Sequence, residues 1–178
     1  MFTQVRVVVV VLITTSLVVV SVAFSQPSRA QYFPYLYRQA LSTGVWPSPD
    51  IQPLIDHNPY YIHGDFDGDG QTDLAMRVHN HENKRGLAIL HATLDTVYII
   101  GAGEPILGIN RELNEEYMRL LPRGRRLRQA FVSIPDLGIT EGSPFEFDRD
   151  AIELGFVAKS AWALYFKVGK HYEIKLAD

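Results

Sequence analysis

The stretch GDFDGDGQTDLA, residues 64–75, decides how the rest of the chain is interpreted. Its central part, residues 65–73 (hereafter the acidic loop), holds four aspartates and two glycines in nine positions. Four carboxylates in one short loop repel one another when no cation is bound. Short acidic side chains at alternating positions can instead converge on one hard cation if glycines let the backbone curl tightly between them. The stretch therefore predicts a calcium site.

The predicted ligands stand at alternating positions of the acidic loop. Calcium takes about six to eight oxygen ligands. Three aspartate carboxylates begin the shell, the main-chain carbonyl of Gln71 adds to it, and Asp73 closes it directly or through water. The full predicted set is Asp65, Asp67, Asp69, Gln71 and Asp73. Because every ligand comes from one local loop, little room is left for a substrate, and the expected role of the ion is structural.

Two other interpretations of the acidic loop are less favoured. An ordinary solvated turn uses one or two Asp or Gly residues, whereas this loop uses six. An EF-hand has the same opening rhythm, but it needs a bidentate glutamate at the twelfth position, which here is Met76. An EF-hand also needs a helix on each side, and both flanks of the acidic loop have the composition of strands.

The same stretch, GDFDGDGQTDLA, resembles the calcium loop of FG-GAP and VCBS-type repeats. The resemblance implies a loop that joins two strands of a propeller blade, with the five residues named above as ligands. A propeller needs about four to eight blades, and the chain holds one good copy of the motif. FEFDRDAIEL (145–154) is a faint echo, with Asp148 and Asp150 ahead of an apolar strand. A closed propeller formed by this chain alone is therefore not expected.

The remaining pattern predicts a mainly β domain of the α+β class. We expect an antiparallel sheet or meander of about six to seven strands, with one or two helices packed on it and the acidic loop between two strands. The nine Tyr, nine Phe and two Trp favour a sheet over a helical bundle. Strands are predicted at 60–66, 74–80, 86–94, 96–103, 151–157, 160–168 and 171–177, with 131–134 as a further candidate, and helices are predicted at 36–43 and 111–124.

The chain divides into three predicted segments. Residues 1–25 begin with a single positive charge, continue as an apolar run over 7–24 and end in small residues, as a signal peptide does. An uncleaved membrane anchor is the alternative, because 18 mostly apolar residues are at the lower limit for spanning a bilayer. Residues 26–59 are a proline-rich wrap that we expect to run over the surface without pairing, and residues 60–178 form one domain.

These segments predict a secreted or periplasmic protein that meets a membrane only through an uncleaved N-terminal segment. The sequence has no cysteine, which excludes both disulfides and a lipid anchor on a cysteine. A net charge of −3 argues against a nucleic-acid partner. No GxSxG motif or cysteine nucleophile is present. We therefore expect a non-catalytic binding module with a protein or glycan partner, and a homo-oligomer stays open.

Two alternative functions come from other residues. His79 and His81 stand two apart beside Glu82, an arrangement that predicts an exported metal-dependent hydrolase if a further zinc ligand joins them. Five arginines lie between Arg119 and Arg128 and could bind an anionic polymer at the cell envelope. The ordinary interpretations are a polar strand end for the histidines and a solvated, dipole-favoured helix end for the arginines.

Overall fold

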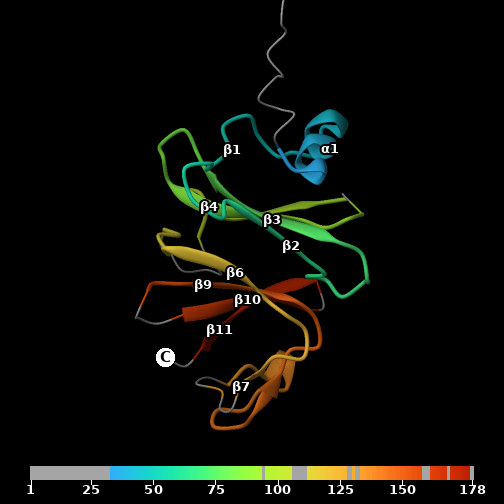
Figure 1. Ribbon diagram of the computed structural model, residues 1–178, viewed down its shortest axis with the longest axis vertical. Coiled ribbons are helices and arrows are strands. Elements are labelled where there is room, and N and C mark those ends of the chain that lie inside the picture. The colour runs from blue at the N-terminus through green and yellow to red at the C-terminus, as the bar shows by residue number, and fades with distance from the viewer. Residues whose placement is uncertain are drawn as a thin grey trace, which may run out of the picture.

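The computed structural model describes residues 33–93, 95–105, 112–127, 130, 133–157, 161–167 and 169–176. These residues form eleven strands, one α-helix and one 3-10 helix, and the strands pair in antiparallel sheets (Figure 1). The predicted mainly β class is therefore confirmed. The predicted signal peptide, residues 1–25, lies outside the described residues. Within the described ranges, no helix has the length and apolar character needed to cross a lipid bilayer.

The first sheet is an antiparallel meander that carries the acidic loop. Four of its five strands, in order along the chain and in pairing, are β2 (Tyr61–Gly64), β3 (Asp73–His79), β4 (Arg85–Leu90) and β5 (Val97–Gly101). Gly64 of β2 pairs with Asp73 of β3, so the acidic loop is the connection between these two strands. The predicted position of the loop between two strands is therefore confirmed.

The second sheet repeats this order. It consists of β6 (Tyr117–Leu121), β9 (Ala151–Gly155), β10 (Ala161–Lys167) and β11 (Lys170–Leu176), each antiparallel to the next. Between its first two strands lie the pair β7 (Arg126–Leu127) and β8 (Phe145–Glu146) and the 3-10 helix η2 (Pro135–Leu137). The segment Asp148–Asp150 directly precedes β9, just as the acidic loop precedes β3. Each half of the molecule thus has an acidic turn at the entry to its second strand.

Apolar side chains cover both faces of both sheets. The two sheets face each other across a buried cluster made up of Phe66, Ala75, Leu87, Ile89, Ile100, Leu113, Met118, Ile152, Leu154, Trp162 and Leu164. Helix α1 (Tyr35–Thr43) packs with Trp46 on the outer face of the first sheet, and the β7–β8 segment lies beyond the outer face of the second (Figure 1). Because both faces are covered, the strands show imperfect polar–apolar alternation in the sequence.

The side chains of β10 alternate between the two faces of the second sheet. Trp162 and Leu164 point into the core between the sheets, whereas Ala161, Ala163 and Tyr165 belong to the outer cluster of the second sheet. The two-residue period of a strand places successive side chains on opposite faces.

The predicted helix at 111–124 is wrong. Residue 111 lies outside the described residues, residues 112–116 have no regular structure, and Tyr117–Leu121 is strand β6. The helical spacing of leucines is overridden by pairing, because β9 offers a partner for every residue of β6. Met118 then points into the core between the sheets and Leu121 into the outer cluster, a period of two in place of 3.6.

The expectation that the wrap, residues 26–59, runs over the surface without pairing is also wrong for its described part. Strand β1 (Gln52–Pro53) pairs with the end of β3 beyond β2, and the N–H of Leu54 donates to the carbonyl of Arg77 at 2.9 Å. The predicted short helix at 36–43 is confirmed as α1, with Leu36, Tyr37 and Ala40 buried. This segment is needed because the outer face of β3 is apolar and must be covered.

Four rings join the two sheets at one end of the interface. His91 and Tyr98 come from the first half of the chain, and Phe166 and His171 from the second. Tyr98 and Phe166 each contact both histidines, with ring centroids 4.8 to 5.4 Å apart. The Nε2 atom of His171 is buried and has no hydrogen-bond partner. A protonated imidazole is therefore poorly accommodated at this position.

The position of His171 predicts a loss of stability in acid. Burial, with the charge of His91 as a smaller cause, lowers the pKa of His171 from 6.5 to about 4. The unfolded chain therefore takes up a proton on this side chain at a higher pH than the folded protein does. The contribution of His171 to stability is present above pH 6.5 and is lost as the pH falls toward 4. Between pH 7 and pH 5, the wild type should lose about 2 kcal/mol more than a His171→Phe variant.

Urea titrations of both proteins at the two pH values measure this difference. Phenylalanine keeps a ring against Tyr98 and Phe166, so packing is largely retained in the variant. Equal pH dependence in the two proteins would contradict the assignment.

Candidate metal centre

The acidic loop is anchored in the core at one residue and exposed at its tip. Phe66 belongs to the cluster between the sheets and is 2% exposed, whereas Gly68, Asp69 and Gly70 are exposed. Gly68 and Gly70 have φ angles of 80° and 85°, in the left-handed region that residues with a Cβ rarely adopt. The glycines therefore provide the tight curl that the sequence predicted.

Three aspartates of the loop converge. Asp65, Asp67 and Asp69 each present a carboxylate oxygen, and the three atoms lie within 4.8 Å of one another. The loop amides also turn inward: the N–H of Gly70 donates to Asp65 Oδ2 at 3.1 Å, and the N–H of Asp69 donates to Asp67 Oδ1 at 3.0 Å. We refer to Asp65, Asp67 and Asp69 as the outer triad.

One oxygen of the outer triad fits a metal ion especially well. Asp65 Oδ1 is buried, and no hydrogen bond satisfies it. A buried carboxylate oxygen without a partner is costly, whereas a cation placed among the three carboxylates would both satisfy it and offset their repulsion. Oxygen-only donors on a flexible loop suit a hard cation such as calcium.

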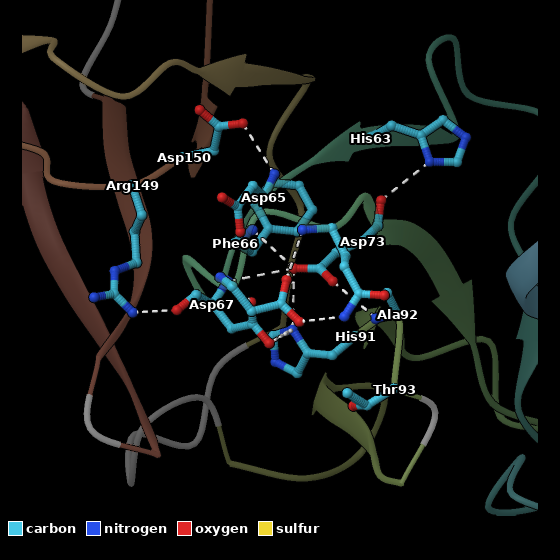
Figure 2. A network of polar contacts seen from close by, with 12 residues as sticks. His63, Asp65, Phe66, Asp67, Asp73, His91, Ala92, Thr93, Arg149 and Asp150 are labelled. Carbon is cyan, nitrogen blue, oxygen red and sulfur yellow. Dashed lines mark hydrogen bonds and ion pairs between the residues drawn. The ribbon is translucent and has the colours of Figure 1, made fainter.

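Asp73 lies beneath the outer triad and is fully buried. Its Oδ2 accepts hydrogen bonds from the N–H of Phe66 at 2.8 Å and of Asp67 at 3.3 Å, and its Oδ1 accepts one from the N–H of Ala92 at 2.9 Å. His91 Nδ1 lies 3.1 Å from Asp73 Oδ2 (Figure 2). The carboxylate of Asp73 thus holds both ends of the acidic loop and the segment after β4.

A second group of possible metal ligands overlaps the first. Asp67, Asp73 and His91 also present ligand atoms within 4.8 Å of one another. Burial opposes protonation of His91, but its hydrogen bond to Asp73 and the charges of Asp73 and Asp67 together raise its pKa. Burial raises the pKa of Asp67, whereas the N–H of Gln71 lowers that of Asp69. The outer triad is the better cation site, because it contains the unsatisfied oxygen Asp65 Oδ1 and lies nearer the solvent, whereas Asp73 is fully buried and both its oxygens accept hydrogen bonds.

Gln71 lies within the loop, close to the predicted shell. Its main-chain N–H donates to Asp69 Oδ1 at 2.7 Å, and its side-chain Nε2 donates to Asp69 Oδ2 at 2.8 Å. These bonds fix the carboxylate of Asp69. The carbonyl of Gln71 stays a predicted ligand.

Sequence reasoning missed the residues that hold the loop from outside. Asp150 Oδ2 accepts from the N–H of Asp65 at 3.0 Å, and the guanidinium of Arg149 donates to the carbonyl of Asp67 (Figure 2). His91 and Ala92 contact Asp73, as described above. The one signal in the sequence was the echo at 145–154, whose aspartates precede a strand as those of the acidic loop do.

The histidine pair proposed as a zinc site does not gather a set of ligands. His79 Nδ1 lies 3.0 Å from the carbonyl oxygen of Asn80, and His81 Nε2 lies 3.9 Å from Glu82 Oε1 on an exposed turn. Among the described residues, neither of the two groups able to hold a metal contains His79, His81 or Glu82.

Two arginines of the predicted cluster form ion pairs with glutamates. Arg119 donates to Glu153 at 2.6 Å, and Arg126 pairs with Glu146. Arg123 and Arg125 are exposed at the turn after β6, and Arg128 lies outside the described residues. Two of the four described arginines therefore have an acidic partner, and the anionic-polymer alternative stays a prediction.

The sequence matches no protein-family model and has no significant match among curated proteins or solved structures.

The hydrogen bonds of Asp73 predict a large loss of stability on substitution, independent of any metal. An Asp73→Asn variant replaces one accepting oxygen by an N–H₂ group that faces donors. Its free energy of unfolding should fall by about 3 kcal/mol. Because Asp69 is exposed, Asp69→Asn should change the free energy by less than about 0.5 kcal/mol.

Urea unfolding of both variants in chelator provides the measurement. Chelator removes any contribution of a bound ion, so the comparison isolates the hydrogen bonds. Similar losses in the two variants would contradict the structural role given to Asp73.

Proposed function

We propose that the protein is an exported, calcium-stabilised β-rich module that acts by binding a partner and not by catalysis. Two observations carry the proposal: the carboxylates of Asp65, Asp67 and Asp69 converge, and Asp65 has a buried oxygen, Oδ1, that no hydrogen bond satisfies. The signal-like segment at residues 1–25 supports export.

Calcium is the proposed ion because of the donor chemistry. The outer triad offers oxygen atoms only, and the predicted fourth ligand, the carbonyl of Gln71, is also an oxygen. Zinc and other transition metals favour imidazole and thiolate ligands. The imidazole of His91 is directed toward the buried carboxylate of Asp73. Magnesium demands near-ideal octahedral geometry, which a loop tip with two glycines does not impose.

The resemblance to FG-GAP and VCBS-type repeats belongs to this proposal. Strands β2–β5 of the first sheet, to which β1 adds a fifth strand, and the four strands of the second sheet each have the antiparallel arrangement of a propeller blade. The acidic loop joins β2 to β3. We regard the protein as a pair of blade-like units packed face to face. The outer faces of both units are covered by other parts of the described chain, so the pair does not depend on further blades.

A binding role is favoured over the hydrolase alternative. The proposed ion is held by neighbouring residues of one loop, which occupy its coordination sphere and leave little space for a substrate. Nothing in the described part of the chain brings His79, His81 and Glu82 together with a further ligand. The proposed partner is a protein or glycan outside the cell.

The proposal predicts that calcium stabilises the protein. At a free calcium concentration about 100 times the Kd, mass action adds about 2.7 kcal/mol. For a domain of this size, that corresponds to a rise in Tm of roughly 5–10 °C. Thermal melts in chelator and in calcium test this, and re-addition of calcium should reverse the effect of chelator.

Variants of the outer triad provide the control. Asp65→Asn combined with Asp69→Asn should abolish the rise in Tm, whereas Asp50→Asn, in the exposed wrap, should leave it intact. Elemental analysis of the purified protein should find calcium without zinc. A Tm that is insensitive to chelator, or stoichiometric zinc, would overturn the proposal.

A further inference from the structure

The acidic loop is held by residues of the second half of the chain. The main chains of Asp65 and Asp150 bond across the gap between the sheets: the N–H of Asp150 donates to the carbonyl of Asp65 at 3.2 Å. The N–H of Asp65 returns a bond of 3.0 Å to Asp150 Oδ2. The other carboxylate oxygen, Asp150 Oδ1, accepts from the N–H of Arg123 at 2.8 Å. Asp150 therefore fixes the first residue of the outer triad to the turn that follows β6.

Arg149 holds the next part of the loop. Its guanidinium donates to the carbonyl of Asp67, and its Nε donates to Asp148 at 2.9 Å. It also lies against Gly68, where a Cβ atom would come within 3.1 Å of the Arg149 Cζ. The side chain thus fills the space that the glycine leaves, and one end of it is fixed by the second sheet.

We propose that Arg149 and Asp150 are positioning residues for the ion site, so that calcium binding and the docking of the second sheet on the first are thermodynamically coupled. This inference rests on the proposed calcium function. The two residues hold the backbone of Asp65 and Asp67, and the backbone sets where the carboxylates of these residues point. A coupling of this kind is reciprocal. If docking of the second sheet raises the affinity for calcium, bound calcium stabilises the docking of that sheet by the same free energy.

The two acidic turns have accordingly taken different roles. In the first turn, carboxylate oxygens of Asp65, Asp67 and Asp69 lie within 4.8 Å of one another. In the second, Asp148 is bonded to Lys167, Tyr165 and Arg149, so its charge is balanced by side chains of its own half. The second turn therefore has cationic groups next to its aspartate, whereas the first turn has converging carboxylates. One of these cationic groups, the guanidinium of Arg149, also donates to the carbonyl of Asp67 in the first turn.

Calcium titration calorimetry on two variants tests the coupling. Asp150→Asn keeps one acceptor oxygen but places an N–H₂ group against the N–H of either Asp65 or Arg123. Arg149→Met keeps the apolar stem and removes the bond to Asp67. Each variant should bind calcium at least about tenfold more weakly than the wild type, which corresponds to about 1.4 kcal/mol.

Asp95→Asn is the matched control. Asp95 carries the same charge and acts on His91 through its field, and it accepts a hydrogen bond from the hydroxyl of Thr93, outside the acidic loop. If only long-range charge mattered, this variant would weaken binding as much as Asp150→Asn does. We expect the calcium affinity of this variant to stay within about threefold of that of the wild type, because removing one exposed charge usually has a small effect.

Amide hydrogen exchange distinguishes coupling between the sheets from an effect confined to the acidic loop. In the wild type, calcium should slow exchange in residues 65–73 and also in β6 and β9 of the second sheet. In Arg149→Met the protection should be confined to the acidic loop. Far-ultraviolet circular dichroism checks that each variant is folded, and Arg149→Met alone carries the test if Asp150→Asn does not fold.

The outcomes separate the two proposals. A wild type that binds no calcium overturns the proposed function and the coupling together. A wild type that binds calcium while both variants bind equally well overturns the coupling alone, as does a control that loses as much affinity as Asp150→Asn. Protection limited to residues 65–73 in the wild type also overturns the coupling.

Discussion

The buried carboxylate of Asp73 is the interaction on which the local structure depends. It stands at the first residue of β3 and accepts hydrogen bonds from the backbone at the start of the acidic loop and from the segment after β4. Charged acceptors that bond several N–H groups are stronger than neutral ones. Through this one side chain, the strand, the loop and the histidine that reaches the aromatic contact between the sheets are fixed relative to one another.

The two acidic turns show how similar sequences are adapted to different surroundings. In the second turn, burial alone would raise the pKa of Asp148, but bonds from Lys167, Tyr165 and Arg149 outweigh it and hold that pKa far below its ordinary value. Burial and the bond to Asp148 raise the pKa of Tyr165 to about 12. The second turn is thus electrostatically complete without an ion, whereas the first leaves an oxygen of Asp65 unsatisfied.

Much of the fold could be predicted because its signals are local. Strand composition beside a loop rich in glycine and aspartate placed β2 and β3 correctly. The segment at 117–121 was not predictable in this way, because its leucines fit a helical face as well as a strand and only pairing with β9 decides between them. The contacts of Arg149 and Asp150 with the acidic loop join residues more than 80 positions apart. No periodicity or spacing in a single sequence encodes such a contact.

The covered outer faces restrict how this molecule can meet another. Helix α1 lies over one broad face and the β7–β8 segment over the opposite one (Figure 1). Neither described sheet therefore has an uncovered face on which a third sheet could pack. Among the described strands, β1, β2 and β5 lie at the edges of the first sheet, and β6 and β11 lie at the edges of the second. Of these, β5 and β11 differ in character: VYIIG is apolar, whereas KHYEIKL contains three charged residues. Charged side chains on an edge strand oppose pairing with a strand of another molecule, so the edge at β5 is better suited than the edge at β11 to such pairing.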